Sequence, residues 1–122
     1  MKTFNQMNNE EAMEPRISVQ CVSSTIHLSA PEITYMVGEG NYTYIHTSSG
    51  KKYLVSKTIK NLHSHLNQSE NFIRVHKSYL INTRHITNYI NQDRVIKMTG
   101  GKEVYVSRRK SKEVKQILAN VL

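Results

Sequence analysis

The stretch Phe72-Ile-Arg-Val-His-Lys-Ser-Tyr-Leu-Ile-Asn82 decides the fold that we predict for this chain. Apolar side chains flank a short polar island, which consists of Arg74 and the triplet His76-Lys77-Ser78. This pattern favours two buried extended segments joined by an exposed turn. The island offers cations, a hydroxyl and an imidazole, which donate hydrogen bonds to phosphates and base edges. A plain polar turn, as found in any basic protein, remains an alternative at this point.

Period-two patterns on both sides of this stretch predict a mainly β fold. Ile17, Val19 and Cys21 alternate with polar residues, as in a half-buried strand. Further strands are expected at residues 25–29, 33–37, 42–47, 51–56, 86–90, 94–98 and 103–106. Turn residues separate them, notably Gly38-Glu-Gly-Asn41, Ser23-Ser24 and Gly100-Gly101. Strands and turns therefore recur about every eight to twelve residues, which is typical of an all-β domain.

Two helices are predicted. The first has Ile59, Leu62 and Leu66 three and four residues apart, and we expect Ser56 to cap its N-terminus. The second is an amphipathic helix over residues 108–122, after a cap at Ser107; its apolar face consists of Val114, Ile117, Leu118 and Val121.

The first turns of the C-terminal helix carry an unusual concentration of cations: Arg108, Arg109, Lys110 and Lys112. A helix N-terminus already bears partial positive charge, so cations there are unfavourable unless an anion offsets them. Helix N–H groups together with arginines form a good phosphate site. The arrangement therefore indicates an anion ligand, with a solvated basic helix face as the alternative.

The charge of the chain is strongly basic. Its 122 residues are enough for one domain and include 17 Lys and Arg against 9 Asp and Glu, a net charge of +8. Residues 1–16 read as a flexible polar tail or linker with net charge −1, which leaves +9 on the domain at residues 17–122. Such an excess favours a polyanionic partner, with nucleic acid first and an anionic membrane surface second. No apolar run approaches the length needed for membrane insertion.

Cysteine and histidine usage predicts neither a disulfide framework nor a metal site or other cofactor. Cys21 is the single cysteine, and we expect it to be a small core residue. His63 and His65 are two residues apart, so a regular helix would point them to different faces. The N-terminus has no apolar segment typical of a secretion signal, and we expect a reducing, cytoplasmic compartment.

Three motifs resemble the LytTR DNA-binding domain of bacterial transcriptional regulators. They are the segment from Gly38-Glu-Gly-Asn-Tyr-Thr-Tyr-Ile45, the stretch at residues 72–82, and Val104-Tyr-Val-Ser-Arg-Arg109. The resemblance covers residues 17–118. It implies an elongated fold of about ten short strands in antiparallel sheets with short helices. It also implies that loops, rather than an inserted helix, read successive major grooves of a bent DNA duplex at repeated half-sites.

By this resemblance, Thr43, Lys77 and Arg109 read bases, and Ser78, Arg108 and Lys112 contact phosphates. The chemistry of these side chains agrees. Arginine pairs with guanine O6 and N7, lysine donates to the same acceptors, and threonine donates, accepts or touches a thymine methyl. From charge alone, Lys57 is a further phosphate candidate. We expect His76 to hold the Lys77 loop through a hydrogen bond.

The resemblance leaves several points open. Many relatives carry an upstream receiver domain, which needs about 100 residues, whereas 16 residues precede Ile17 here. The chain is then a stand-alone regulator or the end of a longer one. The resemblance implies binding to direct repeats, a dimer on DNA and regulation by a partner protein. The sequence favours a regulator that is not an enzyme. The alternatives are an RNA-binding or architectural module without base specificity, and a metal-independent ribonuclease using histidines.

Overall fold

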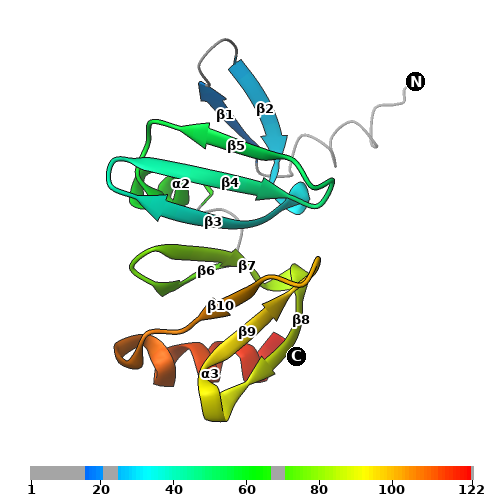
Figure 1. Cartoon of the computed structure of the whole chain (residues 1–122), viewed down its shortest axis with the longest axis vertical. Coiled ribbons are helices and arrows are strands. Elements are labelled where there is room, and N and C mark those ends of the chain that lie inside the picture. Colours follow the sequence, from blue (N-terminus) through cyan, green and yellow to red (C-terminus); the bar gives the residue numbers. More distant parts are fainter. Residues whose placement is uncertain (1–15, 21–24, 67–70, 122) are drawn as a thin grey trace, which may run out of the picture.

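A computed structural model describes residues 16–20, 25–66 and 71–121 (Figure 1). The expected tail at residues 1–16 lies outside the described residues except for Arg16, which begins the first strand. The expected Ser23-Ser24 turn and the core position of Cys21 also lie outside them.

Ten short strands and two α-helices make up the described part of the chain, as the sequence predicted. The strands are β1 (Arg16–Gln20), β2 (Thr25–Ser29), β3 (Ile33–Glu39), β4 (Tyr42–Thr47), β5 (Lys52–Val55), β6 (Phe72–His76), β7 (Tyr79–Asn82), β8 (Ile86–Ile90), β9 (Val95–Met98) and β10 (Glu103–Tyr105). The helices are α2 (Ile59–His65) and α3 (Ser111–Val121), and short 3-10 helices occur at η1 (Ala30–Glu32), η2 (Thr83–His85), η3 (Asn91–Asp93) and η4 (Arg108–Lys110).

The strands form three antiparallel sheets that follow one another along the longest axis of the molecule (Figure 1). The hairpin β1–β2 lies at one end, and a central five-stranded sheet follows in the order β5-β4-β3-β7-β6. The third sheet, in the order β10-β9-β8, lies at the other end together with α3. The predicted mainly β, elongated fold is confirmed.

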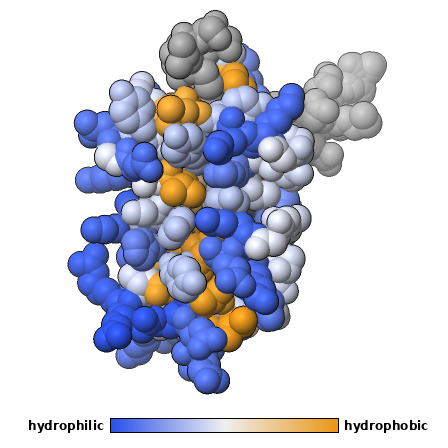
Figure 2. Space-filling view, in the orientation of Figure 1, coloured by the Kyte–Doolittle hydropathy of each residue, from blue (hydrophilic) through white to orange (hydrophobic). Residues whose placement is uncertain are grey.

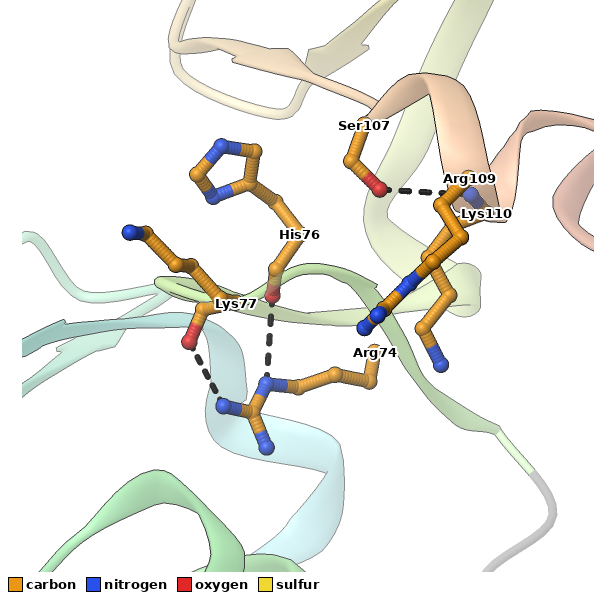
Figure 3. Close-up of a pocket in the computed structure, with 6 residues that line it drawn as sticks. All are labelled: Arg74, His76, Lys77, Ser107, Arg109 and Lys110. Atoms are coloured by element: carbon orange, nitrogen blue, oxygen red, sulfur yellow. Dashed lines mark hydrogen bonds between the residues drawn. The ribbon is translucent and has the colours of Figure 1, made fainter.

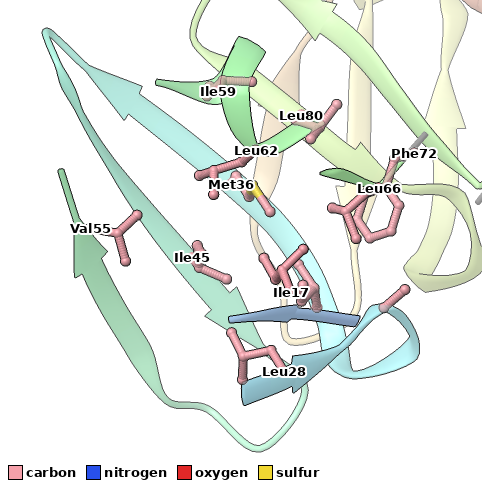
Figure 4. Packing of buried hydrophobic residues seen from close by; sticks show 12 residues of the cluster. Ile17, Leu28, Met36, Ile45, Val55, Ile59, Leu62, Leu66, Phe72 and Leu80 are labelled. Carbon is pink, nitrogen blue, oxygen red and sulfur yellow. The ribbon is translucent and has the colours of Figure 1, made fainter. Parts of the chain in front are cut away.

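Two hydrophobic cores lie on opposite faces of the central sheet. Successive residues of β7 separate them, since Leu80 belongs to the first core and Ile81 to the second, and both are fully buried. The first core, shown in Figure 4, contains Ile17, Leu28, Ala30, Ile33, Met36, Ile45, Val55, Ile59, Leu62, Leu66, Phe72 and Leu80. The second contains Tyr35, Ile73, Val75, Ile81, Ile96, Met98, Val104, Val106, Val114 and Leu118. The stretch at residues 72–82 therefore contributes to both cores.

An irregularity in β6 attaches the C-terminal part of the chain to the central sheet. The pairing of β6 with β7 shifts between Arg74 and His76, so Val75 is the extra residue of a β-bulge. The carbonyl oxygen of Val75 accepts a hydrogen bond of 2.9 Å from the backbone N–H of Ser107. Ser107 immediately precedes η4, and this bond therefore places the start of the C-terminal helix beside the β6–β7 hairpin.

The C-terminal helix forms as the sequence predicted. Ser107 caps it, because its Oγ accepts a hydrogen bond from the backbone N–H of Lys110 at 3.2 Å. The chain then turns through η4 into α3, and Val114 and Leu118 are buried on one face, with Ile117 packed at the edge of the second core.

Several local predictions were wrong. Strand β3 continues to Glu39, β5 spans Lys52–Val55 instead of residues 51–56, and β10 ends at Tyr105. The first helix is capped by Thr58, whose Oγ accepts from the backbone N–H of Asn61 at 3.1 Å, whereas Ser56 is exposed before it. The strand expected at residues 94–98 begins one residue later, because Arg94 adopts a left-handed backbone conformation with φ of 54°. An arginine in this conformation ends η3 and reverses the chain direction.

Asn82, at the end of β7, joins distant parts of the fold through its buried side chain. Its Nδ2 donates to the carbonyl oxygens of Ile33 at 2.9 Å and Ala30 at 3.3 Å, and its Oδ1 accepts from the backbone N–H of Arg84 at 3.0 Å. The side chain is only 1% exposed, so water cannot replace these partners.

We expect Asn82→Ala to lower the free energy of unfolding by about 1–3 kcal/mol, because buried polar groups lose their partners. Urea denaturation of both proteins measures this difference. Asn120→Ala is the matched control, because Asn120 is exposed on α3 and the substitution should leave stability unchanged or slightly higher. Equal effects of both substitutions would show that the Asn82 bonds do not matter for stability.

Candidate nucleic-acid interface

Four connections lie along one edge of the molecule, on the left in Figure 1: the β3–β4 turn, the β5–α2 connection, the β6–β7 turn and the β10–η4 connection. Hydrophilic side chains project from the same edge in the space-filling view (Figure 2). We call this the loop edge. It brings together segments that are up to several tens of residues apart in the sequence.

A cationic hollow of about 450 Å³ lies on the loop edge between the β6–β7 turn and η4. Its walls contain four cationic side chains together with His76 and Ser107; the cations are Arg74, Lys77, Arg109 and Lys110. Figure 3 shows Lys77 and His76 on one side of the hollow and Ser107, Arg109 and Lys110 on the other. Because concave surfaces of one charge concentrate the electric field, this arrangement attracts an anion.

Arg74 stabilises the backbone of the β6–β7 turn through two hydrogen bonds. Its Nε donates to the carbonyl oxygen of His76 at 3.1 Å, and its Nη2 donates to that of Lys77 at 2.5 Å (Figure 3). Burial lowers the pKa of Arg74 from its ordinary value, but a guanidinium still keeps its charge in a protein. Arg74 therefore supplies both a fixed positive charge and the shape of the turn that presents Lys77.

His76 completes this support, as the sequence analysis expected. Its Nδ1 accepts a hydrogen bond of 3.0 Å from the backbone N–H of Ser78, which places the ring proton of the neutral form on Nε2. The ring also lies beside that of Tyr79, with centroids 5.5 Å apart. Lys77 thus stands at the tip of a turn whose backbone is held on both sides.

A second hollow of about 360 Å³ adjoins the first, since Arg74 and Lys77 line both. Its other walls come from Gly38 and Gly40 of the β3–β4 hairpin, from Ser78, and from Thr58, Ile59 and Lys60 at the start of α2. The backbone N–H of Gly38 donates to the carbonyl oxygen of Ser78 at 2.8 Å, which joins the two hairpin tips. A Cβ at position 38 would lie 2.8 Å from Ile59 Cδ1, so glycine permits this close approach.

Among the described residues near the loop edge, Glu39 at the β3–β4 turn and Glu113 on α3 carry negative charge. Lys110 Nζ lies 3.9 Å from Glu113 Oε1, a distance at which solvent-exposed pairs contribute little. Burial lowers the pKa of His63 on α2, and the positive charges of Arg74 and Lys110 lower it further, against a hydrogen bond with the Phe72 backbone that raises it. The two cations of the hollow therefore act on a histidine beside it.

The structure brings together two of the three predicted base-reading residues, because Lys77 and Arg109 line the same hollow and are both exposed. Ser78 lines the second hollow. Arg108, Lys112 and Lys57 are exposed but line neither hollow.

Thr43 does not fit its predicted role. Its side chain is fully buried, and its Oγ1 donates to the carbonyl oxygen of Lys57 at 2.7 Å. In β4 the residue before it points to the other face of the sheet, and Tyr42 is 52% exposed. The accessible side chain at this position of the loop edge is therefore Tyr42, and Thr43 instead ties β4 to the chain that carries Lys57.

Among the cations that line the hollows, sequence reasoning gave no role to Lys60, and it named Arg74 and Lys110 only as members of two cationic groups. Arg74 stood within the polar island and Lys110 within the cation-rich start of the helix, so composition signalled both. Their convergence depends on the bond between Val75 and Ser107, for which the sequence has no local signal.

Within residues 16–20, 25–66 and 71–121, no three His, Cys, Asp or Glu side chains are grouped as metal ligands. None of the helices in these ranges has the length and apolar character needed to cross a bilayer.

The family model of the LytTr DNA-binding domain matches residues 23–119. The chain belongs to the LytTR family of DNA-binding domains. A similar solved structure, the LytTr DNA-binding domain from Bacillus cereus, superposes with a TM-score of 0.73 at 18% identity and covers 86% of this chain and 97% of that one. At this identity, the superposition supports the fold.

Two curated bacterial relatives of this LytTR domain are much longer than it. Sensory transduction protein LytT of Bacillus subtilis strain 168 is 28% identical over 113 residues, which are 90% of this chain and 46% of that protein. Transcriptional regulatory protein LytR of Staphylococcus aureus strain N315 is 31% identical over 98 residues, 77% of this chain and 39% of that protein. The chain therefore spans less than half the length of either relative.

We expect the pKa of His63 to rise when duplex DNA binds, because a phosphate in the hollow would offset the charges of Arg74 and Lys110 that lower it. NMR titration of the His63 ring signals, with and without a DNA duplex, measures the change. The ring of His27, on β2 at the far end of the molecule, is the internal control for buffer effects. An unchanged His63 pKa in the complex would mean that phosphates do not enter the hollow.

Proposed function

We propose that this LytTR domain binds double-stranded DNA sequence-specifically through the loop edge and thereby regulates transcription. The observation that carries the proposal is the hollow in which Arg74, Lys77, Arg109 and Lys110 converge from segments distant in the sequence. A polyanion offsets the repulsion between these cations, and duplex DNA is the polyanion that the family binds.

Base reading is assigned to exposed side chains at the tips of the loops. Arg109 pairs with guanine O6 and N7, and Lys77 donates to acceptors of the same kind. Tyr42 takes the role first expected of Thr43, since its ring can contact a thymine methyl and its hydroxyl can donate or accept. These three residues stand on three different connections, so each reads a separate position of the site.

We assign the contacts with the DNA phosphates to the remaining cations and to Ser78. Arg74 and Lys110 lie between the base readers and hold a phosphate in the first hollow, and Ser78 holds one in the second. Arg108, Lys112 and Lys57 contact phosphates at the rim of the interface. Because Arg74 is already oriented by two backbone carbonyls, little conformational entropy is lost when it binds.

The proposal includes a duplex that bends along the loop edge. The edge runs along the length of the central sheet and on to η4 (Figure 1), so a duplex must follow it to meet every loop. Bending costs free energy that depends on sequence, and the additional contacts offset it. We also propose that the DNA site consists of direct repeats and that two copies of the domain bind side by side on it. A partner protein regulates the domain.

Nucleic-acid binding without base specificity is the second candidate. It requires exposed aromatic faces on which bases can stack. Tyr42 and Tyr105 are exposed and are candidates for stacking. The rings of Tyr44 and Tyr79 instead lie under the ammonium groups of Lys52 and Lys102, and Tyr35 is stacked on His46. A ribonuclease would need paired histidines, and among the described residues lining the first hollow His76 is the single one.

Selection from a random duplex pool at near-physiological salt tests the proposal directly. We expect enrichment of a short motif, repeated in the same direction about one or two helical turns apart. Retention of DNA without an enriched motif would contradict sequence specificity and favour the second candidate. Absence of any retention would contradict DNA binding by this chain.

With the selected site in hand, we expect Arg109→Ala to cost about 1–3 kcal/mol of binding free energy and to relax discrimination at one base position. Fluorescence anisotropy with cognate and singly substituted duplexes measures both effects. Arg84→Ala is the matched control, because Arg84 is exposed on η2, at the opposite edge of the molecule. Full discrimination by the Arg109 variant would remove this residue from the base readers.

We expect Lys112→Ala to weaken binding to all sequences alike and to flatten the dependence of log K on log salt by about one unit, since one phosphate contact is lost. Affinities measured over a salt series give this slope. Lys115→Ala, on the same helix, is the comparison and should keep the wild-type slope. Equal slopes for all three proteins would exclude a phosphate contact by Lys112.

A further inference from the structure

One face of the central sheet lies beyond the cover of the third sheet. Its side chains are on the side of the second core, because Val37 pairs with Tyr44 and Tyr79, and Tyr44 pairs with Leu54. Their neighbours in sequence, such as Ile45 and Val55, belong to the first core on the other side. We call this the open face and define it by Val37, Tyr44, Lys52, Leu54 and Tyr79.

The open face is apolar enough to bind a partner. Leu54 is 40% exposed, which is unusual for a leucine on a sheet, and Tyr42 extends the face toward the loop edge. Figure 2 shows apolar side chains along the middle of this side of the molecule, bordered by hydrophilic ones. Contiguous apolar surface with a polar border is typical of interaction sites.

Two lysine side chains extend over this face and give it a positive charge. Lys52 Nζ lies 5.0 Å from the ring centre of Tyr44, and Lys102 Nζ lies 5.9 Å from that of Tyr79. The acidic residue closest to the face along the strands is Glu39, which pairs with Tyr42 at its rim. The face therefore presents ammonium groups directly beside apolar side chains.

These observations discriminate between occupants. Single-stranded nucleic acid binds by stacking on a series of ring faces, but Lys52 and Lys102 lie over the rings of Tyr44 and Tyr79, and the exposed ring of Tyr42 lies at the border of the face. A second copy of the same face would bring Lys52 and Lys102 against like charges, which is unfavourable. A segment with carboxylates beside apolar side chains fits both the lysines and the surface around Leu54.

We propose that the open face is the docking surface for an acidic, amphipathic segment of a partner protein. Carboxylates of the segment pair with Lys52 and Lys102, and its apolar side chains cover Leu54 and Val37. Among the described strands β5 is the last of its sheet, so an extended segment can also pair with its outer edge. The five residues that define the open face line neither of the two hollows.

Site-specific photo-crosslinking in the native bacterium tests the proposal. A photoreactive phenylalanine analogue at position 54 is compared with the same group at position 92, an exposed residue of η3 on the third sheet. We expect a protein adduct at position 54 alone, and mass spectrometry should map it to a segment rich in Asp or Glu and apolar residues. An adduct with nucleic acid or a second copy of this chain, or no adduct above the level at position 92, would overturn the proposal.

Binding of the synthetic mapped segment then tests the role of charge. We expect Lys52→Glu to weaken its binding about tenfold or more in an anisotropy titration, since an attractive pair becomes repulsive. Lys115→Glu is the control with the same change in net charge, and Leu54→Gln tests the apolar contact without changing charge. Retained thermal unfolding and retained DNA binding show that each variant is folded. Equal affinity of the segment for wild type and Lys52→Glu would overturn the proposal without affecting the proposed DNA interface.

Discussion

The structure depends on the β6–β7 hairpin, which separates two hydrophobic cores. Leu80 and Ile81 are adjacent in sequence, fully buried, and packed into opposite cores. Because successive side chains of a strand point to opposite faces, a register slip of one residue would exchange the two sets and disrupt both cores. The register of this hairpin is therefore strongly specified, and the sheets on both sides are positioned by it.

The same constraint positions the site. The extra residue of the β-bulge, Val75, is buried in the second core while its carbonyl oxygen accepts from Ser107. That bond places η4 opposite the β6–β7 turn, and the two form the walls of the cationic hollow. A charged interface on loops would ordinarily be mobile. Here Arg74 and His76 stabilise the backbone of the turn, and the cap stabilises the start of the helix, so the backbone that carries Lys77 and Arg109 is positioned before any ligand binds.

Periodicity was sufficient to predict the strands, the C-terminal helix and the burial of the stretch at residues 72–82, because these features follow from local side-chain alternation. It was insufficient where one residue decides the outcome. In β4 the register places Thr43 inward and Tyr42 outward, and the motif alone did not distinguish these neighbours. The capping by Thr58 and the left-handed Arg94 likewise depend on backbone geometry at single positions. The proximity of Arg74 and Lys110 could not be predicted from the sequence, because it arises from tertiary contact between segments that are far apart in the chain.

Alternation along β4 and β5 also explains why the molecule has two chemically different surfaces. Ile45 and Val55 fill the first core, so the intervening Tyr44 and Leu54 must face outward on the other side of the sheet. The third sheet covers only part of that side, and the remainder keeps apolar side chains that a monomer would usually avoid exposing. Lys52 and Lys102 lie over the tyrosine rings, where cation–π contact and hydration of the ammonium groups keep this surface soluble. The loop edge, in contrast, brings four cations together around one hollow. The arrangement of the cations, more than the total charge, therefore separates the two surfaces.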